Sequence, residues 1–97
     1  MTSLSALSEQ EVKAVLAVEP EWRLGDGKLL REWVFPDFVA AMAFVQRVAE
    51  LAEAAGHHPD IDIRYNRVGL GLVTHDADGI TQRDVEMARK LSAAFPS

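Results

Sequence analysis

Three histidines in the second half of the chain, His57, His58 and His75, are the residues best suited to chemistry. An imidazole has an unperturbed pKa of about 6.5, so near neutral pH it can both donate and accept a proton. The sequence contains no cysteine, which excludes thiolate nucleophiles, thiolate metal sites and disulfides. These residue types point to proton transfer, or to a metal site built from histidines and carboxylates.

Spacing disfavours two alternatives to proton transfer. Adjacent residues in an extended chain point to opposite sides, so His57 and His58 are poorly placed to hold one zinc ion together. No serine lies in a glycine-flanked elbow, while a strand and a helix cap account for Thr74 and Thr81. We therefore expect no metal and no hydroxyl nucleophile, and a site that works by general acid and base catalysis.

A carboxylate and a proline accompany the adjacent histidines. Glu53 precedes His57 by four residues, a spacing that brings side chains together at the end of a helix, so we expect Glu53 to orient the His57 imidazole. Two histidines after a helix can also do no more than interact with its negative end. Against that reading, Pro59 restricts His58 to extended geometry and so fixes the direction of its side chain.

Capping and turn signals define the first elements that must position these residues. Ser8 and Glu11 have the spacing of a capping box, which predicts a helix over residues 8–18. Two short runs with strand character flank a segment with two glycines, whose freedom to adopt positive φ suits a hairpin turn. The strands of this first hairpin are expected at 22–24 and 29–35.

A long central helix follows, from Pro36 in its first turn to Gly56 as its C-terminal stop. Apolar residues recur in this segment at spacings of three and four, as on one face of a helix. The expected apolar stripe consists of Phe38, Met42, Val45, Val48, Ala49 and Ala52.

The next segment alternates apolar and polar residues with a period of two, which predicts a second antiparallel hairpin. If Asn66 and Arg67 form its turn, the register follows by counting along the ladder. It pairs Tyr65 with Val68, Ile63 with Leu70, Ile61 with Leu72, and His58 with His75. All the apolar residues then share one face, and the two histidines lie together on the other.

Gly69 and Gly71 lie on that second face, where they would leave the strand flat enough for close approach by a ligand or a second subunit. A polar face covered only by water is the alternative. After a turn at 76–79, a closing helix is predicted, because Thr81 and Asp84 again have capping-box spacing. For Asp84, this spacing favours a role as a helix cap over a role beside the histidines.

These elements predict an α+β fold with two layers: a four-stranded antiparallel sheet with helices packed on one face, in the order helix-β-β-helix-β-β-helix. The 97 residues suffice for one domain over 1–97. A net charge of −5 disfavours nucleic-acid binding, and the longest apolar run, 38–45, is far too short to span a membrane. We expect a cytoplasmic protein, and, because an open sheet leaves unpaired edges, at least a homodimer.

The spacing of the candidate residues as a set resembles that of the pterin-4a-carbinolamine dehydratase family. The motif is Glu53, three residues, His57-His58-Pro59, five residues, Tyr65, nine residues, His75, eight residues and Asp84. Two positions depart from the pattern: Ile61 stands where many members carry tryptophan, and Asp78 stands where a first glycine of a pair is common. Neither departure changes a histidine.

The resemblance implies a lyase that dehydrates a 4a-hydroxytetrahydropterin to the quinonoid dihydropterin, in tetrahydropterin recycling, without metal or organic cofactor. It implies that His57 and His75 are general acids for the two faces of the pterin and that His58 mainly binds and orients the ring. Glu53 and Asp84 would support them. The substrate contacts that it implies are Gly56, His57, His58, Pro59, Tyr65, Val73, Thr74, His75 and Asp76.

Some relatives of this family also stabilise a dimeric transcription factor by binding protein, so a noncatalytic binding module is the alternative function. The complete set of three histidines favours the enzyme. The resemblance also implies a homodimer or homotetramer.

Overall fold

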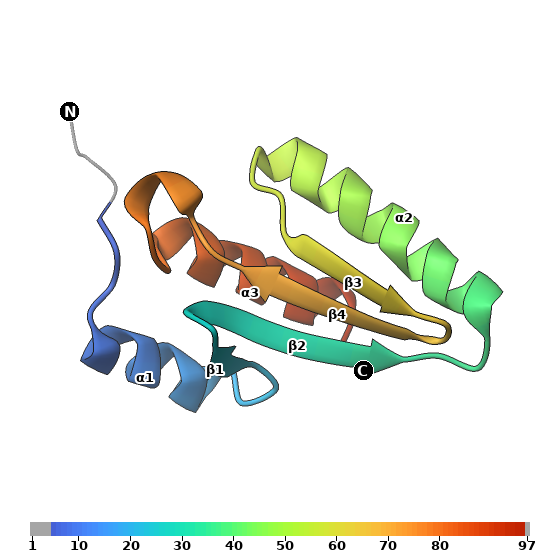
Figure 1. The fold of residues 1–97 in the computed structure, drawn as a ribbon, viewed down its shortest axis with the longest axis horizontal. Helices are drawn as coiled ribbons and strands as arrows, with labels where there is room; N and C mark the ends of the chain where they lie inside the picture. The colour runs from blue at the N-terminus through green and yellow to red at the C-terminus, as the bar shows by residue number, and fades with distance from the viewer. Residues whose placement is uncertain (1–4, 97) are drawn as a thin grey trace.

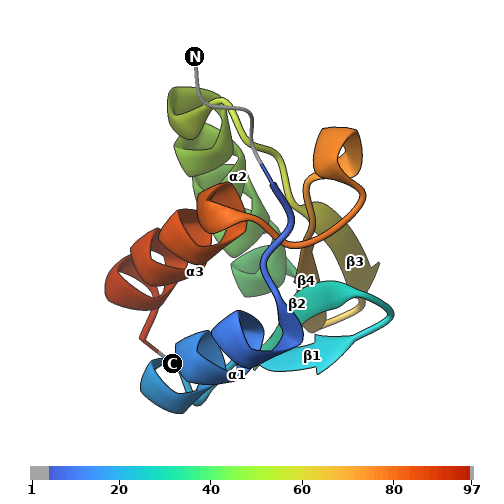
Figure 2. The same cartoon turned by 90° about the vertical axis from the view of Figure 1, so that its left-hand side faces the viewer.

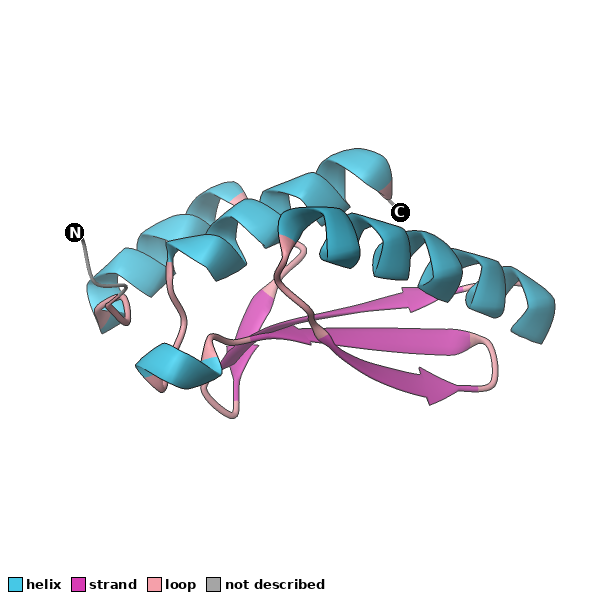
Figure 3. Ribbon diagram, turned by 90° about the horizontal axis from the view of Figure 1, so that it is seen from above, coloured by secondary structure: helices cyan, strands magenta, loops and turns pink. Residues whose placement is uncertain are grey.

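The computed structural model describes residues 5–96 and confirms the predicted class of fold. A four-stranded antiparallel sheet forms one layer, and all three α-helices cover the same face of it (Figure 3). Along the chain the elements are α1 (Glu9–Val18), β1 (Arg23–Gly25), β2 (Lys28–Val34), α2 (Phe38–Ala55), β3 (Asp60–Arg64), β4 (Arg67–Leu72), the 3-10 turn η1 (His75–Ala77) and α3 (Gln82–Ala94).

The sheet has the order β1-β2-β4-β3, so the two hairpins join through their second strands and leave β1 and β3 at the edges. In Figure 1, α2 and α3 run along the larger part of the sheet, while α1 lies beside the first hairpin, as Figure 2 also shows. The core lies between the layers. Its largest fully buried apolar side chains are Leu29, Leu70, Leu72, Met87, Leu91, Val48, Val68 and Val85.

The predicted helix caps are confirmed at both outer helices. Ser8 and Glu11 form a complete capping box at the start of α1, and Thr81 and Asp84 form another at the start of α3. The start of α2 differs slightly, because the Asp37 side chain accepts the amide hydrogen of the third helical residue and the helix begins at Phe38, two residues after Pro36.

The predicted apolar stripe of α2 is partly wrong. Phe38 and Met42 are exposed, whereas Ala41 and Phe44, which the stripe omits, are buried with Val48 and Ala52. Both sets have helical spacing, so spacing does not choose between them. Packing does: the Phe44 ring lies among the rings of three aromatic residues from other parts of the chain, Trp33, Phe35 and Phe95.

The predicted register of the second hairpin is wrong by two residues. Ile63 pairs with Val68 and Ile61 with Leu70, so the turn consists of Tyr65 and Asn66. Asn66 explains the shift, because the end of β2 holds it: its side-chain amide donates to the Phe35 carbonyl at 2.8 Å, and its own carbonyl accepts the Phe35 amide hydrogen.

A shift of two residues keeps every side chain on its predicted face. Gly69 and Gly71 therefore do lie on the face away from the helices, where a side chain at position 71 would meet Leu30 and Lys28 of β2 and Asp60 of β3 and not a helix. The pairing of His58 with His75 does not form, because the ladder ends at Asp60 and Gly71. Within the described residues, no helix is long and apolar enough to cross a membrane.

Candidate active site

The end of α2 directs the first two histidines out of the helix. Gly56 adopts the left-handed conformation (φ 66°, ψ 26°), and its amide and that of His57 donate back to Glu53 and Ala52. This pair of bonds is the Schellman motif, which closes a helix and turns the chain away. Because only glycine adopts this conformation freely, Gly56 determines where His57 and His58 begin their paths.

A fully buried carboxylate lies at the start of α3. Asp84 has no exposed surface, and its Oδ2 accepts hydrogen bonds from the Thr81 amide and the Thr74 hydroxyl, both at 2.8 Å. The Thr74 and Thr81 hydroxyl oxygens are 2.7 Å apart. Since Thr74 donates to Asp84, Thr81 donates to Thr74, and the chain of donors ends on the carboxylate.

The other oxygen of Asp84 holds His57. The distance from His57 Nε2 to Asp84 Oδ1 is 2.6 Å, and the imidazole is 13% exposed. The prediction that Glu53 orients His57 is therefore wrong, and Asp84 does more than cap a helix. Because a carboxylate accepts, we assign the hydrogen to Nε2, which leaves Nδ1 as the ring nitrogen that can meet a substrate.

Glu53 pairs instead with His58. The distance from His58 Nε2 to Glu53 Oε2 is 2.5 Å, and both side chains are more than half exposed. Water screens a pair of this kind, so its contribution to stability is under about 1 kcal/mol. Its effect is to set the orientation of the imidazole.

The third histidine comes from the other side of the site. His75 begins the short turn η1, which Val73 and Thr74 connect to β4. The turn closes through a bridge between Thr74 and Gly79 and a left-handed residue at Asp78. The imidazole is exposed. Within residues 5–96 no side-chain hydrogen bond involves His75, in contrast to the other two histidines.

One pocket of about 270 Å³ brings the three histidines together. Its lining includes seven of the nine predicted substrate contacts, and the one further residue, Arg83, had not been predicted. The sequence feature that could have indicated Arg83 is its position between Thr81 and Asp84. The lining residues are Gly56, His57, His58, Val73, Thr74, His75, Asp76 and Arg83.

The structure does not bring the other two predicted contacts into this lining. Pro59 is half-buried beside His58 but does not line the pocket. Tyr65 lies in the hairpin turn, at the opposite end of β3 from the histidines, and is exposed. In the part of the chain that the structure describes, no group of three or more histidine and acidic side chains is arranged to hold a metal ion.

Comparisons with known proteins show the family of the chain. The family model described as pterin 4 alpha carbinolamine dehydratase matches residues 5–94. A relative from Acidobacterium capsulatum, provisionally named a pterin-4-alpha-carbinolamine dehydratase, is 53% identical over 90 residues, which are 93% of this chain and 98% of the relative. A relative from Chloroflexus aurantiacus with the same provisional name is 56% identical over 82 residues, 84% of this chain and 88% of the relative.

A solved structure gives the same fold. The crystal structure of a transcriptional coactivator/pterin dehydratase from Brucella melitensis superposes with a TM-score of 0.84 and 37% identity, covering 92% of this chain and 97% of that one. The sequence match and the fold agree, and the chain belongs to the pterin-4a-carbinolamine dehydratase family.

Proposed function

We propose that the protein is a lyase that removes water from a 4a-hydroxytetrahydropterin to give the quinonoid dihydropterin. The observation that carries the proposal is the pocket lined by three imidazoles, one of which a buried carboxylate holds in a single orientation. Family membership supports the reaction, and the side chains present suit its chemistry, which is proton transfer alone.

The reaction breaks the C4a–O and N5–H bonds and forms an O–H bond and the N5=C4a double bond. The C4a–O bond breaks as the hydroxyl takes a proton and leaves as water, the N5 lone pair forms the N5=C4a double bond, and N5 loses its proton. An imidazolium can supply the first proton, and a neutral imidazole or water can take the second. We assign the acid role to His57 and His75, which reach the pocket from the segment after α2 and from η1. Each would serve one face of the pterin.

The remaining lining residues bind and orient the ring in this proposal. His58, whose orientation Glu53 sets, contacts the pterin without being the main acid. Main-chain groups at Gly56 and Val73, with Thr74 and Asp76, contact the edges of the ring.

Chelation of metal ions should leave the proposed activity unchanged. Asp84 and Glu53 already hold Nε2 of His57 and of His58, so these two atoms do not converge on a common ion. The rate of water loss from chemically generated 4a-hydroxytetrahydropterin is measured before and after dialysis against a chelator. Loss of activity on dialysis, restored by zinc, would contradict the mechanism and favour a metal site.

A partner-binding role is the second candidate function. The Brucella melitensis protein is named a transcriptional coactivator as well as a pterin dehydratase. In this chain, the start of α2 exposes Phe38, Val39 and Met42, of which Val39 is 76% exposed. An exposed apolar group of this kind on a helix is typical of a protein interface.

We propose that the chain forms at least a homodimer. Among residues 5–96, no strand lies beside the outer edge of β3. All five residues of β3 are exposed, and Ile61 and Ile63 present apolar surface along it. An exposed edge with apolar side chains favours association with a second copy. Sedimentation at micromolar concentration should therefore give a mass at least twice 10.7 kDa. A monomer at that concentration would contradict the association and leave the dehydratase proposal intact.

A further inference from the structure

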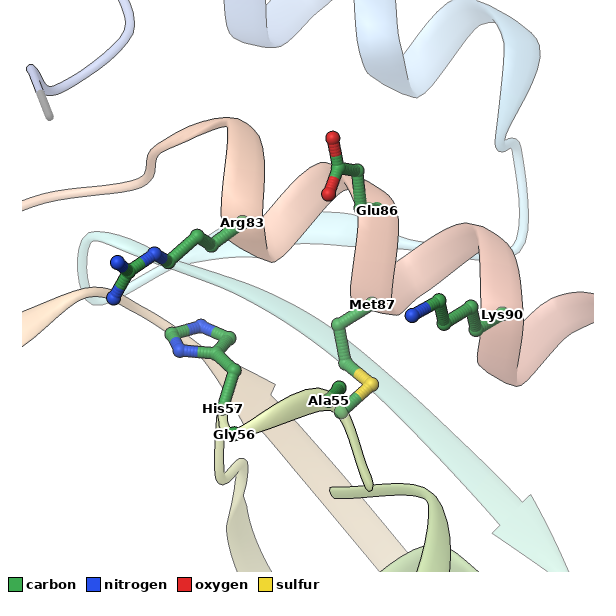
Figure 4. A pocket seen from close by; sticks show the side chains of 7 residues that line it. All are labelled: Ala55, Gly56, His57, Arg83, Glu86, Met87 and Lys90. Carbon is green, nitrogen blue, oxygen red and sulfur yellow. The ribbon is translucent and has the colours of Figure 1, made fainter. Parts of the chain in front are cut away.

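A second hollow lies against the histidine pocket, on the side of His57 that faces α3 (Figure 4). It also has a volume of about 270 Å³. Met87 of α3, which is buried, and Ala55 of α2 give it an apolar part, and three exposed charged side chains of α3 surround it, Arg83, Glu86 and Lys90. These four residues of α3 have spacings of three and four, so they lie on one face of the helix.

The two hollows adjoin, because Gly56, His57 and Arg83 line both. Each is slightly smaller than the roughly 300–1,000 Å³ of typical ligand sites. A bicyclic ring held among the three histidines would occupy the first hollow. A substituent that leaves the ring towards α3 would enter the second.

The charges of the second hollow indicate what kind of substituent it suits. Figure 4 shows the Arg83 guanidinium reaching towards the His57 ring and the Glu86 carboxylate pointing away from it. Glu86 and Lys90 are four residues apart, the favourable order for an ion pair, yet the ion pairs of residues 5–96 include neither Arg83 nor Lys90. Two cations are thus left available beside the site, in a chain whose net charge is −5.

We propose that this hollow, here named the α3 subsite (Ala55, Arg83, Glu86, Met87 and Lys90), binds an anionic substituent carried by the pterin. The inference rests on the proposed function, since it places the ring among the histidines. Arg83 and Lys90 attract the anion, and Met87 contacts the linking carbons. The anion is a phosphate or a carboxylate.

Equilibrium binding with a matched pair of charge-removing variants tests the α3 subsite. The probes are 6-hydroxymethylpterin, its phosphate monoester and pteroylglutamate. Their binding is measured by pterin fluorescence. For the wild type, we expect the better of the two acidic probes to bind about 5-fold or more tightly than 6-hydroxymethylpterin. Lys90→Gln should reduce that ratio of dissociation constants about 5-fold, because it removes a charge that lines the hollow. Arg89→Gln removes the same charge from the same helix outside the lining, and should leave the ratio at the wild-type value.

Each outcome separates this inference from the proposed function. A phosphate is the substituent if the monoester binds more tightly, and a carboxylate if pteroylglutamate does. The α3 subsite is wrong, and the ring site stands, if 6-hydroxymethylpterin binds but neither acidic probe binds more tightly than it does. The same conclusion follows if both variants change the ratio of dissociation constants equally. If none of the three probes binds, the proposed function itself fails. Added salt should lower the wild-type ratio of dissociation constants towards one, since it screens exposed charges.

Discussion

Replacement of Asp84 by Asn is expected to lower kcat/KM for pterin dehydration by about 100-fold. The Oδ1 atom of Asp84 holds His57 Nε2 at 2.6 Å, and a carboxylate can only accept there. In Asp84→Asn, an amide nitrogen takes that place and donates, so His57 Nε2 must accept and cannot carry a hydrogen. The ring then cannot become the imidazolium, with a hydrogen on both nitrogens, that the acid role of His57 requires.

The control for this variant is Asp62→Asn, which removes the same charge from the exposed face of β3. The amide oxygen of Asp84→Asn can still accept from the Thr81 amide, so the cap of α3 is kept and we expect the variant to fold. Circular dichroism checks that it does. A folded Asp84→Asn protein with the activity of the Asp62→Asn control would contradict the assigned role of the His57–Asp84 pair.

Trp33→Ala is expected to lower the free energy of unfolding by about 3–5 kcal/mol. Trp33 is 3% exposed, and its ring contacts the rings of Trp22 and Phe44 at centroid distances of 5.9 and 5.0 Å. Its indole nitrogen donates to the Phe95 carbonyl at 3.1 Å, which ties β2 to the end of α3. Since small domains are stable by only about 5–15 kcal/mol, this loss is a large fraction of the total.

Urea unfolding monitored by circular dichroism measures this effect, and the neighbouring residue supplies the control. Val34 follows Trp33 on β2 but points to the other side and is 60% exposed, so Val34→Ala should change stability by less than about 0.5 kcal/mol. Equal losses of stability in the two variants would show that the core is not centred on Trp33 and the aromatic rings that it contacts.

Local signals in the sequence predicted the elements well, because the residues that carry them act within a few positions of themselves. Ser8 with Glu11, and Thr81 with Asp84, cap helices through bonds over three residues. Gly56 ends α2 as predicted, because it takes a conformation that other residues avoid.

The predictions that were wrong concern contacts between residues that lie far apart in the sequence. The turn of the second hairpin is fixed by Asn66 and Phe35, which are 31 residues apart, so no count along the hairpin alone could find it. The predicted partner of His57 was wrong for a related reason. The rule that residues four apart meet holds within a helix, and the left-handed Gly56 ends the helix before His57. His57 therefore reaches Asp84 on α3, 27 residues later, and His58 returns to Glu53.

The most direct test of the proposed dehydratase is the decay of chemically generated 4a-hydroxytetrahydropterin, followed by stopped-flow absorbance with and without protein. We predict that the wild-type protein accelerates the decay without added metal, and that a folded variant with His57, His58 and His75 all replaced by alanine does not. A triple variant that remains folded and retains full activity, or a wild-type protein that leaves the decay rate unchanged, would contradict the proposal.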